Sequence, residues 1–447
     1  MGNGLVALVP CKHQAAGAGG PPCECASENL SGSGREAAMT HRGYSTSGRR
    51  GRRPSLVAES RRSRRVQTTH NGDCAARRLL LYWCMSTTPS AARMPAVFDP
   101  RRAAAIARRI HVLTTAAARR WDRASAWSAD ALPRLADFAS RGKLVRGQLV
   151  LLGAELAGVR QSRTLFDCAA ALELFHSSIL IHDDLIDNDA VRRGTAAMHI
   201  QLADAVRARG ERMHAAARGT ALAMCTADCG FFLTFNILAQ LALPEATRRE
   251  LLTLWSKEFA LVTLAEMDDV HLSPGATPAP REAIWRVYQY KTARYTFCLP
   301  LMTGLIVARA PAALRRSVLS FGENLGLLFQ LKDDELGLFG TTKETGKPVG
   351  TDIIQCKKTL YHHYLLTCTP PEVQKRLRTL FGAPHLRAQD VAYVQRIVRE
   401  SGIDETLHTA AADLAARARR IATRLPVPPA LQAQLLQLVN YSTARTS

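Results

Sequence analysis

The sequence SILIHDDLID, residues 178–187, ends an apolar run with three closely spaced aspartates, Asp183, Asp184 and Asp187. If the run is helical, Asp183 and Asp187 share one face, whereas Asp184 lies about 100° round the axis. Carboxylates this close repel one another unless a cation lies between them. Hard oxygen ligands on one rigid face suit Mg²⁺, particularly when phosphate oxygens complete its octahedron. A solvated acidic helix end is the alternative for this motif taken alone.

Helical periodicity extends along the chain on both sides of this motif. Apolar residues recur at three- and four-residue spacing through residues 101–120, 149–180, 202–241, 248–270, 284–307 and 314–331. Convincing strand alternation is missing, and Gly and Pro cluster between the helical segments. We therefore predict an all-α fold, a bundle of long helices.

The first 93 residues have a different composition. They are rich in Gly, Ser, Pro and Arg, and residues 1–84 carry 13 Lys and Arg against 5 Asp and Glu. Such a segment cannot bury enough apolar surface to offset the entropy of ordering. We predict a low-complexity basic leader over 1–93, disordered or a mis-assigned start with Met85 or Met94 as the first residue, and one folded domain over 94–447. A basic arm for nucleic acid or an anionic membrane is the alternative, although aromatic residues for base stacking are almost missing from the Arg-rich run.

Composition also argues against several other classes of protein. The chain has 447 residues and is 47% hydrophobic, which is enough for a large core. No run approaches the roughly 18–20 uninterrupted apolar residues of a membrane span. The 11 cysteines are dispersed, which fits reduced thiols in a cytoplasmic protein better than a disulfide framework. The sequence therefore predicts a cytoplasmic protein rather than an integral membrane protein.

A second acidic pair and several isolated cations complete the chemical pattern. Asp333 and Asp334 end another apolar helical stretch, far downstream of the first motif. Basic residues stand in the short segments Gly142-Lys143-Leu144-Val145-Arg146, Arg192-Arg193-Gly194, Tyr290-Lys291-Thr292 and Gly346-Lys347-Pro348. Carboxylates that hold Mg²⁺, together with cations that clamp the remaining oxygens, suit a phosphate or diphosphate ligand.

Six motifs, in this order, resemble those of the trans-isoprenyl diphosphate synthases, the all-E polyprenyl synthetase family, over roughly residues 98–440. They are Gly142-Lys143…Arg146, Glu173…His176, Asp183-Asp184…Asp187…Arg192-Arg193-Gly194, Lys291-Thr292, Phe329-Gln330…Asp333-Asp334 and Gly346-Lys347…Asp352…Lys357-Lys358-Thr359. The resemblance implies an isoprenoid-synthase-type bundle of long helices around a central cavity. It also implies a homodimer.

The resemblance further implies two facing diphosphate sites. In one, Asp183, Asp184 and Asp187 would hold two Mg²⁺ ions (or Mn²⁺) and Asp333 a third, all bound to the diphosphate of an allylic substrate. The groups implied to contact that diphosphate, or the charge developing near it, are Arg192, Lys291, Gln330, Lys347 and Lys357. Thr292 and the Gln330 amide are expected to stabilise the allylic cation through their dipoles. Isopentenyl diphosphate, the homoallylic substrate, would bind to Lys143, Arg146, His176 and Arg193.

This division implies a prenyltransferase mechanism. Metal ions activate the diphosphate that leaves, whereas a metal-free pocket of cations holds the diphosphate that stays attached. The implied reaction is ionisation of the allylic diphosphate, head-to-tail condensation with isopentenyl diphosphate, and loss of a proton. A dry aliphatic cavity would keep water away from the allylic cation.

Several positions depart from the family pattern. Gly147 stands where proline is common, which is expected to loosen the local backbone. Gly337 stands where a final Asp often stands, and Cys356 where glycine is usual. Glu266 adds negative charge near the cavity, which leaves the metal-site role of Asp269 open. We interpret these departures as variation within an active enzyme.

Product length is expected to depend on residues that precede the first acidic motif. Ser178 is small and would not block a growing chain, whereas Phe175 lies about 12 Å along the helix from Asp183 and on a face similar to that of Ser178. A floor at Phe175 would favour a C20 product, with C15 next. Ordinary core packing of Phe175 is one alternative, and a floor formed by Phe231 and Phe232 is another.

Two other functions are weighed against prenyl transfer. A class I terpene cyclase shares the all-α fold but has no need for the homoallylic group of Lys143, Arg146 and His176. A non-catalytic regulatory subunit or a nucleic-acid-binding protein would be built around the basic leader. The intact metal-binding pattern disfavours the regulatory subunit, and no recognisable binding module supports nucleic-acid binding.

Overall fold

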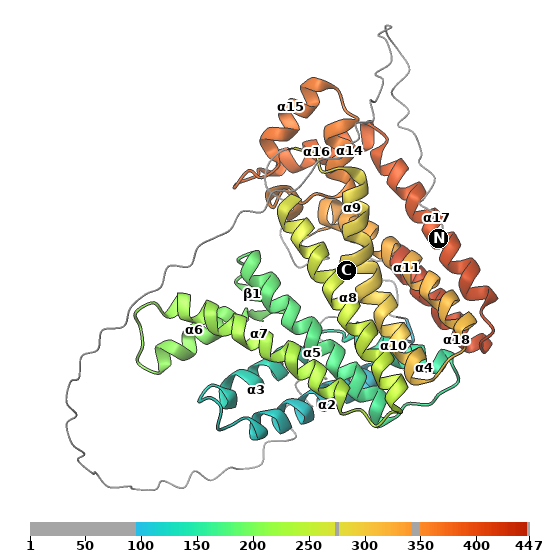
Figure 1. The fold of residues 1–447 in the computed structure, drawn as a ribbon. Coiled ribbons are helices and arrows are strands. Elements are labelled where there is room, and N and C mark those ends of the chain that lie inside the picture. Colours follow the sequence, from blue (N-terminus) through green and yellow to red (C-terminus); the bar gives the residue numbers. More distant parts are fainter. Residues whose placement is uncertain (1–94, 273–276, 342–348, 445–447) are drawn as a thin grey trace, which may run out of the picture. The chain divides into compact units, whose positions relative to one another are not determined.

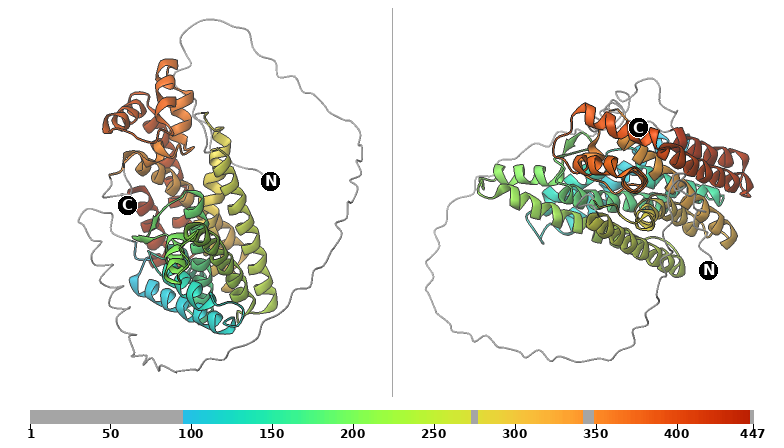
Figure 2. Two further views of the ribbon diagram at one scale, coloured as in Figure 1. Left: turned by 90° about the vertical axis from the view of Figure 1, so that its left-hand side faces the viewer. Right: turned by 90° about the horizontal axis from the view of Figure 1, so that it is seen from above.

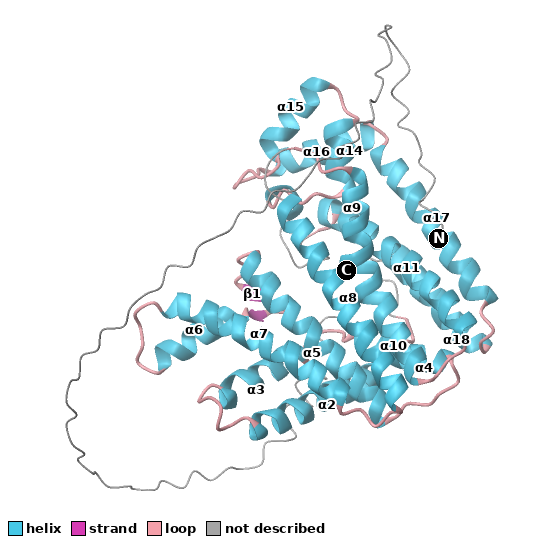
Figure 3. Ribbon diagram, viewed as in Figure 1, coloured by secondary structure: helices cyan, strands magenta, loops and turns pink. Residues whose placement is uncertain are grey.

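Helices make up almost all of the regular structure in the part of the chain that the computed structural model describes, residues 95–272, 277–341 and 349–444 (Figures 1 and 3). The predicted leader, 1–93, and Lys347 lie outside these residues. The all-α prediction is confirmed. One short hairpin interrupts the helices, with Val191 paired to Ala196 in antiparallel register.

The elements follow one another along the chain in a simple order. They are α2 (Pro100–Arg120), α3 (Ser128–Ala139), α4 (Val145–Leu156), α5 (Arg163–Ile186), β1 (Val191–Arg192), β2 (Thr195–Ala196), α6 (Met198–Ala208), α7 (Ala215–Ala239), α8 (Glu245–Leu272), α9 (Arg281–Val287), the π-helix η1 (Tyr288–Cys298), α10 (Leu299–Val307), α11 (Ala312–Phe339), α13 (Thr351–Ile354), α14 (Leu360–Thr367), α15 (Pro371–Leu380), α16 (Ala388–Glu400), α17 (Ile403–Arg424) and α18 (Pro429–Ala444).

Two of the long periodic stretches are each broken into two helices. The stretch 149–180 is divided between α4 and α5, where Gly158 adopts a φ of 77° and Ser162 caps α5 by accepting a hydrogen bond from the Leu165 amide at 3.3 Å. The stretch 202–241 is divided between α6 and α7, where Gly210 has a φ of 87°. Periodicity predicts the helical faces but not these breaks, because the apolar pattern continues on both sides of each turn.

The π-helix η1 is a feature that the sequence pattern does not predict. It joins α9 to α10 in one continuous rod, and Pro300 stands at the start of α10. Proline has no amide proton and its ring collides with the carbonyl of the preceding turn. We attribute the wider turn of η1 to this local loss of the α-helical hydrogen bond. Such widened turns often occur at functional sites.

The helices pack around two hydrophobic cores. One core surrounds α5, which packs against α4 and α7, and includes Phe138, Leu172 and Trp255. The other surrounds α11, which packs against η1 and α17, and includes Phe321 and Leu325. In Figures 1 and 2 the orange helices α14 to α16 lie at the opposite end of the bundle from the blue helices α2 and α3. The two acidic motifs end α5 and approach the end of α11.

Within the described residues, two helices are long and apolar enough to cross a membrane by length and composition, α5 and α7. Core helices of globular proteins pass the same test. In α5 the apolar segment is 67% buried within the structure, and in α7 it is 44% buried. The burial of α5 and its position in a core identify it as a packed interior helix.

Candidate active site

The three aspartates of the first acidic motif lie in and just after the last turn of α5 and have different surroundings. The side chain of Asp183 is 21% exposed, whereas that of Asp184 is 1% exposed. Asp187 is exposed and ends the helix, with its amide donating to the Asp183 carbonyl at 2.8 Å. Burial, and then the charge of Asp183, raise the pKa of Asp187. Asp183 and Asp187 are therefore open to a ligand, while Asp184 is turned inward, in line with its offset round the helix.

Arg192 of the hairpin balances the charge of this motif. Its guanidinium donates to Asp184 Oδ1, and Nη2 lies 3.2 Å from Asp183 Oδ2 and 3.1 Å from Asp189 Oδ2. Burial raises the pKa of Asp184 to about 6, although Arg192 opposes the rise. Within the described residues, Asp184 Oδ2 is buried and makes no hydrogen bond. Arg192 thus holds the acidic motif in a charge-balanced state.

A basic cluster formed by Arg146, His176 and Arg193 gathers around the buried Glu173. Glu173 is 1% exposed, and the charges of Arg146 and Arg193 oppose the rise in its pKa that burial causes. Burial lowers the pKa of His176 well below its ordinary value, and both arginines add to this effect, so the imidazole is neutral at neutral pH. Lys143 lies exposed instead, with Nζ 3.4 Å from the hydroxyl of Tyr441 on α18.

The two arginines of the basic cluster are fixed by neighbouring elements. Arg146 Nη2 donates to Thr296 Oγ1 at 2.8 Å, and Arg193 Nη1 donates to the Phe138 carbonyl at 2.7 Å. In the part of the chain that the structure describes, Arg146 Nε and His176 Nδ1 are buried without a hydrogen-bond partner. Buried donors of this kind favour a polar ligand, because an unsatisfied polar group is costly to bury.

Lys291 lies on the π-helix and pairs with two carboxylates of α8. Its Nζ is 2.6 Å from Glu266 Oε2 and 2.6 Å from Asp269 Oδ2. Burial alone would lower the pKa of Lys291, but the charges of Asp269 and Glu266 raise it above its ordinary value. The charge of Lys291 also opposes the rise in the pKa of Asp187. This cation therefore lies within electrostatic reach of the first acidic motif.

The second acidic motif presents one aspartate and buries the other. Asp333 is exposed, whereas Asp334 is buried and accepts hydrogen bonds from the Tyr288 hydroxyl and from Gln330 Nε2, the latter at 2.8 Å. Thr292 Oγ1 donates to Gln330 Oε1 at 2.6 Å, which fixes the orientation of the Gln330 amide. Burial raises the pKa of Asp334 to about 8. Asp333 is thus the member of the pair that a ligand can reach from solvent.

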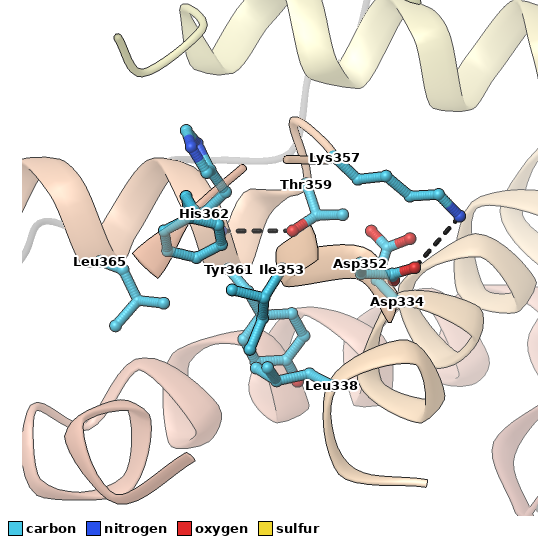
Figure 4. Close-up of a pocket in the computed structure, with 10 residues that line it drawn as sticks. Asp334, Leu338, Asp352, Ile353, Lys357, Thr359, Tyr361, His362 and Leu365 are labelled. Atoms are coloured by element: carbon cyan, nitrogen blue, oxygen red, sulfur yellow. Dashed lines mark hydrogen bonds and ion pairs between the residues drawn. The ribbon is translucent and has the colours of Figure 1, made fainter. Parts of the chain in front are cut away.

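Lys357 connects the two acidic motifs. Its Nζ lies 3.1 Å from Asp352 Oδ1, and Figure 4 shows the carboxylates of Asp334 and Asp352 close together beneath it. Burial alone would lower the pKa of Lys357, but the charges of Asp352, Asp334 and Asp333 raise it above its ordinary value. The charge of Lys357 in turn opposes the rise in the pKa of Asp187 at the end of α5. The ends of α5 and α11 therefore share one electrostatic environment.

Aromatic rings from three helices gather below the first acidic motif. The ring of Phe175 stacks on Phe259 of α8, and its centroid lies 4.8 Å from that of Phe231 on α7. Ser178 is fully buried and packs so closely on Gly230 that a Cβ there would collide with the serine hydroxyl. Phe232 is 74% exposed. The alternative in which Phe232 helps to form a floor within its own subunit is therefore wrong, whereas Phe175 and Phe231 lie together.

The donors at the two acidic motifs have the chemistry that Mg²⁺ prefers. No group of three or more His, Cys, Asp or Glu side chains forms a ready-made metal cage in residues 95–272, 277–341 and 349–444. This arrangement fits Mg²⁺, which commonly takes one or two carboxylates, water and the phosphate oxygens of a substrate rather than an all-protein cage. The accessible carboxylates of Asp183, Asp187 and Asp333 and the unpartnered Oδ2 of Asp184 can supply such ligands.

Some functional neighbours have no signal in the sequence. Tyr288, which bonds the buried Asp334 and accepts a hydrogen bond from the Leu360 amide at 3.0 Å, belongs to no motif. Glu173 stands in a motif, but its place at the centre of the basic cluster depends on the packing of α4 on α5. Only the resemblance to the family pattern pointed to Glu173.

Comparison with known proteins gives a consistent result. The family model described as polyprenyl synthetase matches residues 132–399. A geranylgeranyl diphosphate synthase of Saccharolobus solfataricus is 26% identical over 267 residues, which cover 60% of this chain and 75% of that protein. A geranylfarnesyl diphosphate synthase of Aeropyrum pernix is 29% identical over 306 residues, which cover 67% of this chain and 88% of that protein.

A solved structure is similar over most of the described chain. It is a geranylgeranyl pyrophosphate synthase of Corynebacterium glutamicum in complex with isoprenyl diphosphate and magnesium. The TM-score is 0.71 at 26% identity, and the match covers 77% of this chain and 99% of the other.

Proposed function

The chain belongs to the polyprenyl synthetase family, and on that premise we propose that it condenses isopentenyl diphosphate with an allylic diphosphate to give an all-E prenyl diphosphate. The reaction is a head-to-tail prenyl transfer. A C20 product is favoured, with C15 next. Relatives that make geranylgeranyl, geranylfarnesyl and farnesyl diphosphate support chain elongation by prenyl transfer.

The observation that carries the proposal is that a cation pairs with carboxylates at each acidic motif, Arg192 with Asp183 and Asp184, and Lys357 with Asp352 beside Asp334. A ligand that needs both motifs at once has to present several anionic oxygens within a small volume. A diphosphate does so.

The first acidic motif and Asp333 are proposed as the metal ligands for the allylic diphosphate. Asp183 and Asp187 are accessible on one face of α5, and Asp333 is exposed on α11. Mg²⁺, when bound, neutralises the diphosphate and activates it as a leaving group. Asp184 is also proposed as a metal ligand through its Oδ2, because its Oδ1 already accepts a hydrogen bond from Arg192.

Cationic side chains around the allylic site take up the negative charge of the departing group. Lys291 and Lys357 are held by carboxylates in the free protein, and Arg192 is held by the first acidic motif. Because charge on the diphosphate grows as it leaves, these cations bind the transition state more tightly than the substrate. Lys347, outside the described residues, is proposed for the same set. The hydrogen bond from the Thr292 hydroxyl to the Gln330 amide fixes the orientation of both side-chain dipoles beside this site.

Isopentenyl diphosphate is proposed to bind at the basic cluster. Arg146 and Arg193 supply the charge, and the neutral imidazole of His176 supplies a hydrogen-bond donor. Lys143 joins them if its side chain swings away from Tyr441, which a flexible exposed lysine can do. Glu173 keeps the cluster together through its charge.

The test is product analysis with the full chain. Protein is incubated with Mg²⁺, isopentenyl diphosphate and a C5, C10 or C15 allylic diphosphate, and the products are sized after dephosphorylation. Linear prenyl alcohols are expected from wild type. Asp183→Asn and Asp333→Asn should each reduce kcat at least about 100-fold, because each removes a ligand used in the transition state. Asp413→Asn, an exposed change on α17, is the matched control and should leave turnover unchanged.

Other outcomes of the same assay decide between the alternatives. Cyclic hydrocarbon formed without isopentenyl diphosphate would identify a terpene cyclase. The basic cluster argues against that outcome, since a cyclase has one diphosphate to bind. No product from any primer would contradict the proposal and favour a regulatory subunit.

We also propose that the protein is a cytoplasmic homodimer. Fractionation of cells that produce the full chain tests the location, and the association state is treated in the Discussion.

A further inference from the structure

The ammonium of Lys291, on the π-helix η1, is held between two carboxylates of α8. Its Nζ lies 2.6 Å from Glu266 Oε2 and 2.6 Å from Asp269 Oδ2. An ammonium has three N–H donors, and these two contacts use two of them. With both carboxylates ionised, the three side chains together carry a net negative charge. A cation of the proposed diphosphate site therefore belongs to a group that is anionic as a whole.

Glu266 adds its charge to the surroundings of the first acidic motif. Burial raises the pKa of Glu266, Lys291 opposes the rise, and the charge of Asp183 adds to it. The charge of Lys291 in turn acts on Asp187. The side chain of Glu266 is 21% exposed, so its charge is only partly screened by water. An anion that approaches this motif therefore meets the negative charge of Glu266 as well as that of the aspartates.

We propose that Glu266 makes the site select a diphosphate that carries a divalent cation over a diphosphate that carries none. A free diphosphate is repelled by Glu266 and has to compete with two carboxylates for Lys291. A divalent cation bound to the diphosphate neutralises part of this repulsion. Selective sites commonly include such a repulsive group beside the attractive ones. Glu266 thus determines specificity through its charge and through Lys291, and the inference rests on the proposed function because it concerns the same site.

The hydrogen bond to Lys291 does not by itself require a carboxylate at position 266. The side-chain oxygen of a glutamine accepts the same hydrogen bond at the same reach along the side chain. The carboxylate adds only a negative charge. Glu266→Gln therefore removes the charge and keeps the acceptor. Asp268→Asn, at an exposed position of the same helix, is the matched control for the loss of one negative charge.

The experiment compares pyrophosphate binding with and without a divalent cation. Inorganic pyrophosphate is titrated into the full chain by calorimetry, once in EDTA and once with saturating Mg²⁺. Excess isopentenyl diphosphate is present throughout, so that the basic cluster is occupied. The ratio of the two dissociation constants gives the preference for the metal-bound diphosphate. Turnover of wild type with an allylic diphosphate is measured separately.

Wild type should bind pyrophosphate much more tightly with Mg²⁺ than in EDTA. Glu266→Gln should bind pyrophosphate in EDTA about 10-fold more tightly than wild type does, the size of effect expected when one charged hydrogen-bonding group becomes available. With Mg²⁺ the two proteins should agree within about threefold, since the cation already offsets the charge. Asp268→Asn should match wild type within about twofold in both conditions, because an exposed charge is screened.

A gain in metal-free binding cannot come from a loss of folding, so it separates this role from a structural one. Circular dichroism and Tm establish that each variant is folded. Glu266→Met, which has a similar volume and no charge, replaces Glu266→Gln if the glutamine variant does not fold.

Three results would overturn the inference. Binding in EDTA by folded Glu266→Gln within about twofold of wild type would show that the charge does not act on the diphosphate. An equal gain in Asp268→Asn would assign the effect to the overall charge of the surface. Weaker binding by folded Glu266→Gln with Mg²⁺ would identify Glu266 as a metal ligand or an anchor of Lys291 instead. If wild type condenses prenyl substrates and one of these results occurs, the inference alone fails; if wild type makes no product but the expected pattern holds, the proposed function alone fails.

Discussion

The backbone amide of Gly147 on α4 donates a hydrogen bond to Glu173 Oε1 on α5 at 2.7 Å. Burial raises the pKa of Glu173, and this hydrogen bond, together with the charges of Arg146 and Arg193, opposes the rise. Proline, common at this position in the family, has no amide proton and could not make the contact. The sequence suggested that glycine loosens the backbone here. The structure gives the opposite result. The hydrogen bond to Glu173 holds the Gly147 backbone, and a Cβ at this position would lie only 3.1 Å from Cδ1 of Ile106.

Gly147→Pro should therefore destabilise the protein by about 1–3 kcal/mol, since it leaves a buried carboxylate short of one donor. Urea unfolding monitored by circular dichroism gives the free energy of unfolding. Gly147→Ala is the control, because it adds a similar crowding Cβ but keeps the amide. Equal stability of the two variants would show that the hydrogen bond contributes nothing.

Phe175→Ala should lengthen the product if Phe175 is the floor of the chain cavity. Its ring packs on Phe259 and Phe231, so truncation opens space below the first acidic motif. The loss of a buried ring should also cost about 3–5 kcal/mol of stability. Products are sized with a C15 primer. Phe232→Ala, on the exposed face of α7, should leave product length unchanged. An unaltered product from Phe175→Ala would identify Phe175 as core packing only.

The exposed side of α7 is the surface on which we expect the homodimer to form. Phe232 is 74% exposed and Met224 is 46% exposed on this apolar helix. Large apolar side chains that gather on an exposed surface often mark a site of protein–protein contact. Phe232→Asp should shift the protein from dimer to monomer in multi-angle light scattering. Asn236→Asp, a change of similar charge one turn away, is the control for charge alone. A monomeric wild type, or an intact dimer of Phe232→Asp, would contradict this prediction.

The sequence predicted the parts of the site that depend on helical period and failed where tertiary pairing decides. The shared face of Asp183 and Asp187 and the offset of Asp184 from it follow from 3.6 residues per turn, whereas the burial of Asp184 depends on the packing around α5. The partners of Lys291 on α8 could not be predicted as a pair, because they depend on how α8 packs against η1. Ser178 illustrates the same limit.

Ser178 has the small size that the sequence argument requires, yet its position gives it a different role. It is fully buried against Gly230 of α7, which closes the space between α5 and α7 at that level. Side-chain size can be read from a sequence, but the neighbour across a helix contact cannot. The aromatic group around Phe175 is likewise assembled from three helices. The sequence argument named Phe175 and, as an alternative, Phe231, but it could not place the two together or predict Phe259 of α8 beside them.

Asp334 should make the stability of the metal-free protein fall as pH rises. The ordinary carboxyl pKa is about 3.9 in an unfolded chain, whereas burial raises that of Asp334 to about 8 in the fold. Between these values the native state holds a proton that the unfolded state has released. By linkage the free energy of unfolding then decreases with pH, from about 4 up to about 8, and changes no further through this group above that range.

Asp334→Asn removes this titration while the amide can still pair with Gln330 and Tyr288. The Tm of Asp334→Asn relative to wild type should therefore rise from about pH 5 to about pH 8 in EDTA and then level off, measured by scanning calorimetry. Taking the difference cancels the other titrating groups, which both proteins share. Asp413→Asn, exposed on α17, is measured beside it as the control for replacing one carboxylate by an amide. A flat difference for Asp334→Asn as well would mean that the buried carboxyl keeps an ordinary pKa, and that its bonds to Tyr288 and Gln330 hold an ionised group.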